Sequence, residues 1–277
     1  MVAKPTGNSP AQRQLSTLSH TTRPYWQLPP GVERGMWEYA QSPDIATQYD
    51  DYFALNSLFE FDQQVAARYF QPPGLVVDLG CGTGRALLPL VRRGHRGLAV
   101  DLSRHMLGIV REKSRLEGLP VDCVLLNLVE MDALRDGFAD YCMCMFSTLG
   151  MVRGRANRAK VLRSVRRILK PGGTFIVHAH NFWHNLLDAD GPWWVLKSLL
   201  MGLGRRDFEV GDKHFPYRGI PNMFLHVFRR GELRRELRRA GFTSTRFIPL
   251  DTARRHSLPQ PWLLGRIRAN GWVVICQ

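Results

Sequence analysis

The chain has 277 residues, of which 44% are hydrophobic, so it is long enough to bury one large core. It contains no run of eighteen or more uncharged apolar residues, and its first residues lack the order of a secretory signal; we expect neither a membrane-spanning helix nor secretion. The five cysteines form no C-x-x-C pair. This argues against disulfides or a metal such as structural zinc and favours reduced thiols in a cytoplasmic protein.

The charge balance is strongly basic. There are 38 Lys and Arg residues against 24 Asp and Glu residues, for a net charge of +14. Such a charge attracts nucleic acid or anionic membranes. Arginine is spread along most of the chain, however, and this suits ordinary solvated helices equally well, so both explanations stay open.

The N-terminal third divides into two parts. Residues 1–35 are rich in Ser, Thr, Gln and Pro and predict a flexible leader, with Tyr25 and Trp26 as a late anchor. Residues 36–70 carry apolar and aromatic residues at helical spacing, which predicts one or two helices leading into a single domain of residues 36–277. Tyr49, Asp50 and Tyr52 could close over a ligand there, although helix packing explains them as well.

From residue 75 onward, strands alternate with helices. Apolar strands separated by helices of this length indicate an α/β fold, in which a parallel sheet is covered on both faces. The predicted strands are 75–80, 97–103, 121–128, 139–147 and 172–180, and the predicted helices are 84–93, 104–117 and 155–169.

Residues 182–228 break this alternation. The segment is rich in aromatic residues and too long for a simple connection, so it predicts an inserted lid. "RRGELRRELRRAGF" then predicts a charged helix that ends at Gly241, and "STRFIPL" and "GWVVIC" predict the closing strands.

The most informative stretch is "VVDLGCGTGR", residues 76–85. Gly80, Gly82 and Gly84 allow a sharp turn and a close ligand approach, and the helix that follows offers unpaired N–H groups. A dinucleotide site requires G-x-G-x-x-G, but Arg85 stands at the third glycine position, and Asp78 is poorly placed for a pyrophosphate. S-adenosylmethionine carries an ammonium and a carboxylate but no phosphate, and therefore suits this turn better than NAD does.

The second strand supplies an independent signal. "GLAVDLS" ends at Asp101, where a carboxylate can accept hydrogen bonds from both ribose hydroxyls of an adenosine, and Leu102 can cover one face of the adenine. A lone aspartate in this position is also a common helix N-cap, although Ser103 could equally cap the next helix.

These residues resemble a known family. "VVDLGCGTG", "AVDLS", "DYCMCMFSTLGM" and "RRILKPGGTFIVH" are similar to the class I S-adenosylmethionine-dependent methyltransferases, mainly over residues 40–180. The resemblance implies a Rossmann-like sheet of seven mostly parallel strands in the order 3-2-1-4-5-7-6, with one antiparallel strand. It also implies that the methionine end of the cofactor lies at the turn and its ribose at Asp101. The implied turn residues are Asp78, Gly80, Cys81, Gly82 and Gly84.

Two further positions follow from the resemblance. The family often pairs the adenine amino group with an acid or amide after the third strand, but the matching position here is Leu128. Asn127, Glu130 or the backbone of Leu128 and Val129 could replace that group. Phe146, just after the fourth strand, is placed to contact the cofactor near its sulfonium, or it is an ordinary core aromatic.

Methyl transfer from a sulfonium mainly requires alignment of the nucleophile and exclusion of water. A fixed catalytic triad is therefore not needed, and the sequence identifies no catalytic residue. "FIVHAHN" places His178 and His180 on one face of the fifth strand, with His180 and Asn181 at its carboxyl end. His180 is a candidate general base, although most histidines in strands are structural.

Three hypotheses remain for the acceptor. The favoured one is a small or lipid-like molecule beneath the lid, because "PWWVLKSLLMGLG" could line an apolar pocket or touch a membrane surface. The second is tRNA, because "HVFRRGELRRELRRAGF" and "NGWVVICQ" faintly resemble tRNA wobble-uridine carboxymethyl methyltransferases, and residues 153–170 hold eight Lys or Arg and no acid. The third, an inactive scaffold of the same fold, is opposed by the intact turn and Asp101. The sequence does not determine the oligomeric state.

Overall fold

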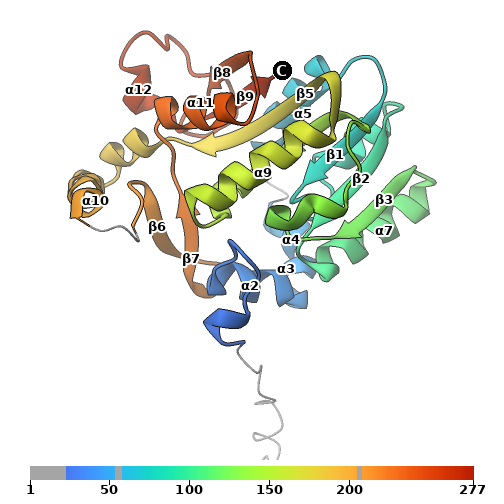
Figure 1. The fold of residues 1–277 in the computed structure, drawn as a ribbon, viewed down its shortest axis with the longest axis horizontal. Helices are drawn as coiled ribbons and strands as arrows, with labels where there is room; N and C mark the ends of the chain where they lie inside the picture. The colour runs from blue at the N-terminus through green and yellow to red at the C-terminus, as the bar shows by residue number, and fades with distance from the viewer. Residues whose placement is uncertain (1–22, 54–57, 205–207) are drawn as a thin grey trace, which may run out of the picture.

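A seven-stranded sheet forms the centre of the molecule (Figure 1). The computed structural model describes residues 23–53, 58–204 and 208–277. The sheet order is β3-β2-β1-β4-β5-β9-β8; β1 to β5 run parallel, and β9 is antiparallel to both of its neighbours. The predicted α/β class and the order 3-2-1-4-5-7-6 are therefore confirmed. The strands are β1 (Leu75–Leu79), β2 (Arg96–Asp101), β3 (Val121–Leu125), β4 (Ala139–Cys144), β5 (Leu169–His180), β8 (Thr245–Pro249) and β9 (Gly271–Cys276).

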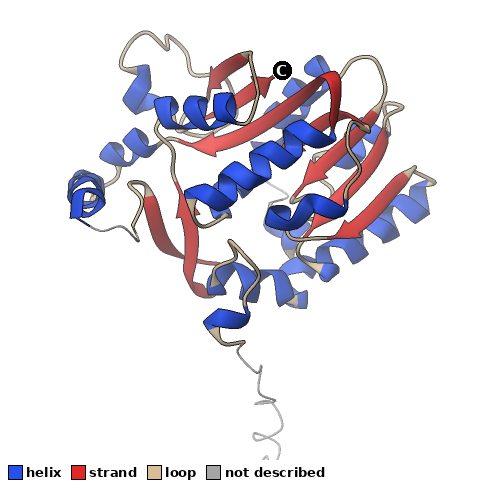
Figure 2. Ribbon diagram, viewed as in Figure 1, coloured by secondary structure: helices blue, strands red, loops and turns tan. Residues whose placement is uncertain are grey.

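Helices cover both faces of this sheet (Figure 2). Alternate residues of β1 point to opposite sides: Val77 packs with α9 and α11, whereas Val76 packs with α5, α6 and α7. This double burial explains why the central strands are almost entirely apolar. The helices are α5 (Leu58–Tyr69), α6 (Leu87–Val91), α7 (Arg104–Glu117), α8 (Thr148–Met151), α9 (Arg155–Ile168), α11 (Arg230–Arg239) and α12 (Gly265–Arg268), with a 3-10 turn η2 (Leu128–Ala133).

Several element boundaries differ from the sequence prediction; β2, β3 and β4 end at Asp101, Leu125 and Cys144 rather than at residues 103, 128 and 147. α6 begins at Leu87 rather than at residue 84, because the glycine turn uses the preceding residues. β5 begins at Leu169 rather than at residue 172, because Leu169 already pairs with Ala139 before the ladder shifts register.

The N-terminal segment packs on the sheet domain earlier than predicted. Residues 1–22 of the expected leader lie outside the described residues, and η1 (Tyr25–Gln27) follows them. Tyr25 and Trp26 are exposed, whereas the Gly31 carbonyl accepts a bond from the Arg153 amide at 2.9 Å. Contacts with the domain therefore begin ahead of the boundary predicted at residue 35. The helices that follow are α2 (Arg34–Gln41), α3 (Pro43–Thr47) and α4 (Tyr49–Tyr52).

Residues 182–228, the predicted lid, contain η3 (Phe182–Leu187), α10 (Gly191–Gly204) and a hairpin of β6 (Asp212–Tyr217) and β7 (Ile220–His226). The hairpin reaches down to α2 (Figure 1). Gly35 permits this close approach, since a Cβ there would lie 2.2 Å from the Asn222 carbonyl oxygen. α10 buries Val195 but leaves Trp193 exposed. Among the described residues, no helix is long and apolar enough to cross a membrane.

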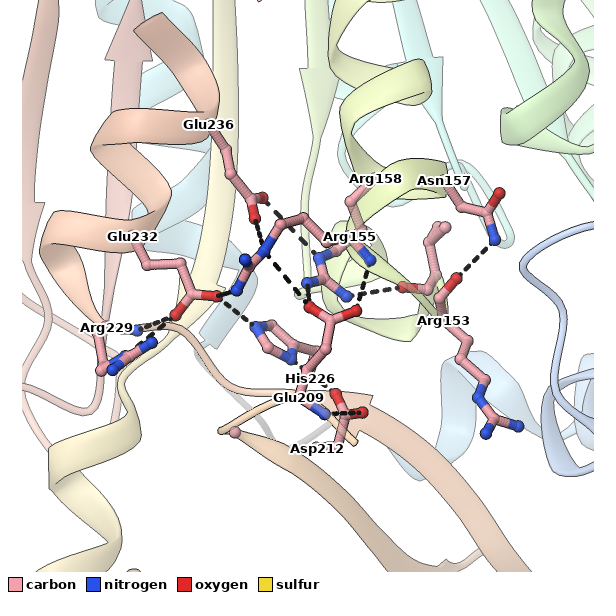
Figure 3. Close-up of polar contacts among 12 residues, drawn as sticks. Arg153, Arg155, Asn157, Arg158, Glu209, Asp212, His226, Arg229, Glu232 and Glu236 are labelled. Carbon is pink, nitrogen blue, oxygen red and sulfur yellow. Dashed lines mark hydrogen bonds and ion pairs between the residues drawn. The ribbon is translucent and has the colours of Figure 1, made fainter. Parts of the chain in front are cut away.

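A buried ion-pair network joins the hairpin to α9 and α11 (Figure 3). His226 of β7 lies between Asp212 at 2.8 Å and Glu232 of α11 at 3.2 Å. The fully buried Arg158 of α9 donates to Glu209 at 2.7 Å. Glu209, His226 and Glu232 place one possible metal-ligand atom each within 4.8 Å of one another. Since Arg158 and its neighbour Arg155 already bring positive charge to these carboxylates, the cluster is built as an ion-pair network.

Candidate functional site

A cavity opens at the carboxyl ends of β1 and β2, where ligands bind in open α/β sheets. Its walls come from the glycine turn, the end of β2, the start of η2, the turn after β4, the N-terminal helices and the hairpin. They comprise Gly31, Val32, Met36, Tyr39, Ala40, Tyr49, Gly80, Gly82, Asp101, Leu102, Ser103, Met106, Asn127, Leu128, Phe146, Thr148, Met151, Val152 and Tyr217.

The turn after β1 needs its glycines. Gly80, Gly82 and Gly84 have φ values of 77°, 53° and 80°, in the left-handed region that other residues rarely adopt. A Cβ on Gly80 would lie 2.4 Å from Cγ2 of Thr148. Gly82 instead borders open space, because a Cβ there would meet only the Tyr49 ring, at 3.8 Å. The turn is thus closed on one side and open toward the cavity.

Asp101 connects this turn to the second strand. Its Oδ2 accepts from the Gly82 amide at 2.8 Å, and its Oδ1 accepts from the Ser103 amide at 2.8 Å. Burial raises the pKa of Asp101, and these backbone donors act in the opposite direction. Ser103 caps α7 by accepting from the Met106 amide at 3.3 Å. The helix therefore has its own cap, and Asp101 faces the cavity.

Three predicted cofactor residues do not line the cavity. Asp78 is buried behind the turn with no hydrogen-bond partner for Oδ2, and burial, aided by the charge of Asp101, raises its pKa to about 8. Cys81 is also buried, and its thiol pKa is raised by desolvation. A Cβ on Gly84 would lie 3.1 Å from Leu88. These residues shape the turn from behind.

The other predicted residues do line it. Leu102, Leu128 and Phe146 are wall residues, as is Asn127. The Asn127 side chain is already engaged: its Nδ2 donates to the Pro30 carbonyl at 3.0 Å, and its Oδ1 accepts from the Val129 amide at 3.2 Å. Glu130 is not a wall residue. Of the replacements considered for the adenine partner, the Val129 amide is engaged by Asn127 as well, so the backbone of Leu128 is the remaining candidate.

Three tyrosines from distant segments also border the cavity: Tyr39 of α2, Tyr49 of α4 and Tyr217 of the hairpin. The Tyr39 and Tyr217 ring centroids are 6.1 Å apart. Desolvation raises the pKa of Tyr217 to about 12, so its hydroxyl stays protonated at neutral pH. We refer to these three side chains as the tyrosine roof. The sequence singled out only Tyr49, because Tyr39 and Tyr217 follow no local motif.

Asp50, next to Tyr49 of the tyrosine roof, connects α4 to the glycine turn. Its carboxylate accepts from Thr83 Oγ1 at 2.6 Å and forms an ion pair with Lys113 of α7. Arg85, which takes the third glycine position of a dinucleotide motif, donates to the Asp50 carbonyl at 3.2 Å. The side chain that excludes NAD from the motif therefore has a structural role here.

A second, larger cavity of about 720 Å³ adjoins the first. The two cavities share Phe146, Met151 and Tyr217 as wall residues. The second cavity is bordered by Tyr52, Phe53, Phe146, Ser147, Met151, His180, Asn181, His184, Asn185, Asp188, Lys213, Phe215, Tyr217, Leu225, Val227, Thr252, Arg254 and Asn270.

The shared wall is backbone-strained. Phe146 and Ser147 have φ values of 53° and 63°, an uncommon conformation for two successive residues other than glycine. Ser147 Oγ accepts from the His180 amide at 3.3 Å, which ties this turn to the end of β5. Strain of this kind is concentrated at functional sites, where the surrounding structure holds it in place.

His180, the candidate general base, is a neutral wall residue of the second cavity. Its Nδ1 lies 3.2 Å from Asn270 Oδ1, and Arg254 Nη1 lies 3.4 Å from its Nε2. Burial and the charge of Arg254 lower its pKa to about 3. Because Asn270 accepts from Nδ1–H, Nε2 is left facing a guanidinium donor, which opposes proton uptake. His178 beside it is buried, and its pKa is also lowered by desolvation.

Comparison with known proteins shows which domain the residues of this site resemble. Residues 77–177 match the family model described as a methyltransferase domain. A ubiquinone biosynthesis O-methyltransferase from Xanthomonas campestris pv. campestris is 29% identical over 117 residues, which cover 42% of this chain and 47% of that protein. The chain thus spans about half the length of the curated relatives it matches.

Two solved structures share the fold. A SAM-dependent methyltransferase from Methanosarcina mazei has a TM-score of 0.60 at 20% identity, over 77% of this chain and 96% of that one. The CcbJ methyltransferase from Streptomyces caelestis has a TM-score of 0.60 at 23% identity, over 86% of this chain and 96% of that one. The matched residues 77–177 contain the glycine turn, Asp101 and Phe146. Residues 77–177 therefore match a methyltransferase domain, the chain has the fold of the S-adenosylmethionine-dependent methyltransferases, and S-adenosylmethionine is the cofactor that these comparisons support.

Proposed function

We propose that the chain transfers a methyl group from S-adenosylmethionine to a small-molecule acceptor held in the second cavity. The observation that carries this proposal is the common wall of the two cavities at Phe146, Met151 and Tyr217. An in-line displacement requires donor and acceptor to meet without intervening water. Two adjoining cavities that meet at two aromatic side chains and one thioether suit that requirement.

The residues of the first cavity fit the cofactor. Gly82 leaves a space that any Cβ would enter, and the buried Oδ2 of Asp78 lacks a partner behind the same turn. Asp101 would hold the ribose, and Leu102 and Leu128 would cover the adenine. When bound, the cofactor supplies an electrophilic methyl group on a sulfonium. The protein aligns the acceptor and excludes water, and the neutral His180 is not placed to remove a proton at neutral pH.

The second cavity favours a small, partly polar acceptor over a lipid. Its volume of about 720 Å³ lies in the usual range for small-molecule sites. Its lining combines aromatic rings with amide, imidazole and charged side chains, and no residue of α10 takes part. The apolar side chains that α10 exposes, such as Trp193, are thus not part of the acceptor site.

The tRNA alternative depends on how many cations in two basic segments, residues 153–170 and α11, form no ion pair with an acid of the protein. In residues 153–170, six of the eight cations form ion pairs with acids from other segments, through Arg153, Arg155, Arg158, Lys160, Arg167 and Lys170. That face is thus largely neutralised. α11 keeps Arg230, Arg234, Arg235, Arg238 and Arg239 exposed, and this surface favours the alternative.

A labelling experiment tests the proposal. The protein would be incubated with methyl-labelled cofactor and either a small-molecule extract or bulk tRNA, and the labelled product identified by mass spectrometry. Label in a small molecule supports the proposal, and label in RNA with salt-sensitive binding supports the tRNA alternative. Calorimetry with S-adenosylmethionine and NAD is the companion measurement. A protein that binds the cofactor but labels neither extract would be the inactive scaffold.

A further inference from the structure

We propose that the acceptor carries a carboxylate, and that Arg254 and Lys213 bind it inside the second cavity. This inference rests on the proposed function, since it names the chemical class of ligand for the same cavity. It depends on where the two cations lie, on the absence of a carboxylate at ion-pair distance from either of them within the described residues, and on the strained backbone of Arg254.

Arg254 is held at the end of the cavity nearest the cofactor site. Its guanidinium lies 5.4 Å from the centre of the Phe146 ring, which belongs to the shared wall. One donor points at His180 Nε2, 3.4 Å away. The residue has a φ of 59°, so the loop after β8 accepts backbone strain to present this side chain. Arg254 is half-buried, and desolvation lowers the pKa of its guanidinium.

Lys213 reaches the same cavity from the hairpin. Its Nζ donates to Asn185 Oδ1 at 2.8 Å and lies 5.3 Å from the centre of a Trp194 ring. Both contacts position the ammonium without neutralising it. Within the described part of the chain, neither Lys213 nor Arg254 has a carboxylate at ion-pair distance.

The two cations act on a common region. Desolvation lowers the pKa of His180 most, and Arg254 and Lys213 both lower it further, which places the two cations on the same side of the cavity as this imidazole. Asp188 is the one carboxylate among the described wall residues, and it is exposed and pairs with neither cation. Asp62 of α5 is not a wall residue of the cavity. Burial raises its pKa to about 7, although the positive charge of Arg254 acts to lower it.

These facts define the ligand by its charge. A partly desolvated cation with no carboxylate at ion-pair distance is costly, and a bound anion reduces that cost. A guanidinium presents parallel donors that match the two oxygens of a carboxylate, and a lysine adds a point charge. Because Arg254 lies against Phe146, a carboxylate held there places the acceptor beside the wall shared with the cofactor cavity.

The test uses benzoate and its neutral isostere benzamide, since Phe53, Phe215 and Tyr217 give the cavity aromatic walls. The full-length protein would first be titrated with S-adenosylhomocysteine, and each probe would then be titrated into the loaded protein by calorimetry. We expect benzoate to bind and benzamide to bind about tenfold more weakly or not at all. Arg254→Gln and Lys213→Gln should each weaken benzoate about tenfold, and Arg254→Lys less.

Matched controls separate the possible failures. Arg255→Gln removes the neighbouring exposed arginine, which is not a wall residue, and should leave benzoate affinity unchanged. Equal binding of benzoate and benzamide, absence of benzoate binding, or equal benzoate affinity in Arg254→Gln would each overturn the inference. If the wild-type protein does not bind S-adenosylhomocysteine, the proposed function is overturned instead.

Discussion

Asp101 illustrates how a single carboxylate organises the cofactor cavity before any ligand arrives. One oxygen fixes the Gly82 amide and the other fixes the Ser103 amide, so the glycine turn and the start of α7 are set relative to each other. Each carboxylate oxygen keeps a second lone pair for a ligand. The residue is therefore at once part of the scaffold and part of the site.

Replacing Asp101 should thus weaken cofactor binding. Asp101→Ala is expected to reduce S-adenosylmethionine affinity by on the order of 1–3 kcal/mol, because ribose hydroxyls would be left buried without an acceptor. Calorimetry measures the change. Asp122→Ala, which removes an exposed carboxylate from β3 on the neighbouring strand, is the control and should have no effect. An unaltered affinity in Asp101→Ala would show the ribose assignment to be wrong.

At the level of residues, the sequence located cavity-lining positions where a motif directly follows a strand. Gly80, Gly82, Asp101 and Leu102 come immediately after β1 or at the end of β2, so strand and motif locate them together. Tyr39 lies in a helix that looks like any other amphipathic helix. Arg254 lies in a loop without a motif, and only the folded chain brings it to the cavity.

Among the elements, the hairpin of β6 and β7 was the hardest to predict. Pro216 and Pro221 interrupt its strands, and most of β6 is only half buried, so the alternation that marks a strand is weak. The sheet strands were predictable because burial on both faces makes them continuously apolar. The hairpin instead depends on α2 at its tip and on the ion-pair network at its base (Figure 3).

That network should make stability depend on pH. Burial opposes the charged form of His226, but its bonds to Asp212 and Glu232 outweigh this and raise its pKa above the ordinary 6.5. The contribution of charged His226 to the free energy of unfolding is therefore complete below pH 6.5, and it is lost as pH rises through the higher pKa that His226 has in the folded state. Burial likewise opposes ionised Glu232, yet His226 lowers its pKa from 4.5 to about 2. That contribution is complete above pH 4.5 and is lost as pH falls toward 2.

Thermal unfolding of His226→Gln across pH checks this expectation. The melting temperature should fall furthest below wild type between pH 4.5 and 6.5, and the difference should shrink on the alkaline side. His256→Gln is the control, because His256 is 80% exposed beside Asp251. A difference that grows with rising pH would contradict the charged state assigned to His226.

At the scale of the whole molecule, the sheet and its two helical layers are separate from the tyrosine roof. Two of the roof residues come from the N-terminal helices and the third from the hairpin, far along the chain. The sheet itself begins only at Leu75. The part of the chain that folds the sheet is thus distinct from the part that covers the cofactor cavity.

Deletion of residues 1–41 tests this separation. The truncated chain should still unfold cooperatively and keep the strand contribution to its circular dichroism spectrum, because the deletion removes η1 and α2 but no strand of the sheet. It should lose about tenfold or more in S-adenosylmethionine affinity, because the side chains of Met36 and Tyr39 leave the cavity. Deletion of residues 1–22, which removes none of the described wall residues, should preserve the affinity. Equal affinities in the two truncations would argue against the roof.

The ring of Phe146 has one more consequence. It is one of three side chains that border both cavities, so a shift of the ring to suit an occupant of one cavity also changes the wall of the other. If the bound methyl donor raises the affinity for the acceptor, the bound acceptor raises the affinity for the donor by the same factor, because such linkage is reciprocal. The strained turn that carries Phe146 would thus couple the binding of the two proposed ligands.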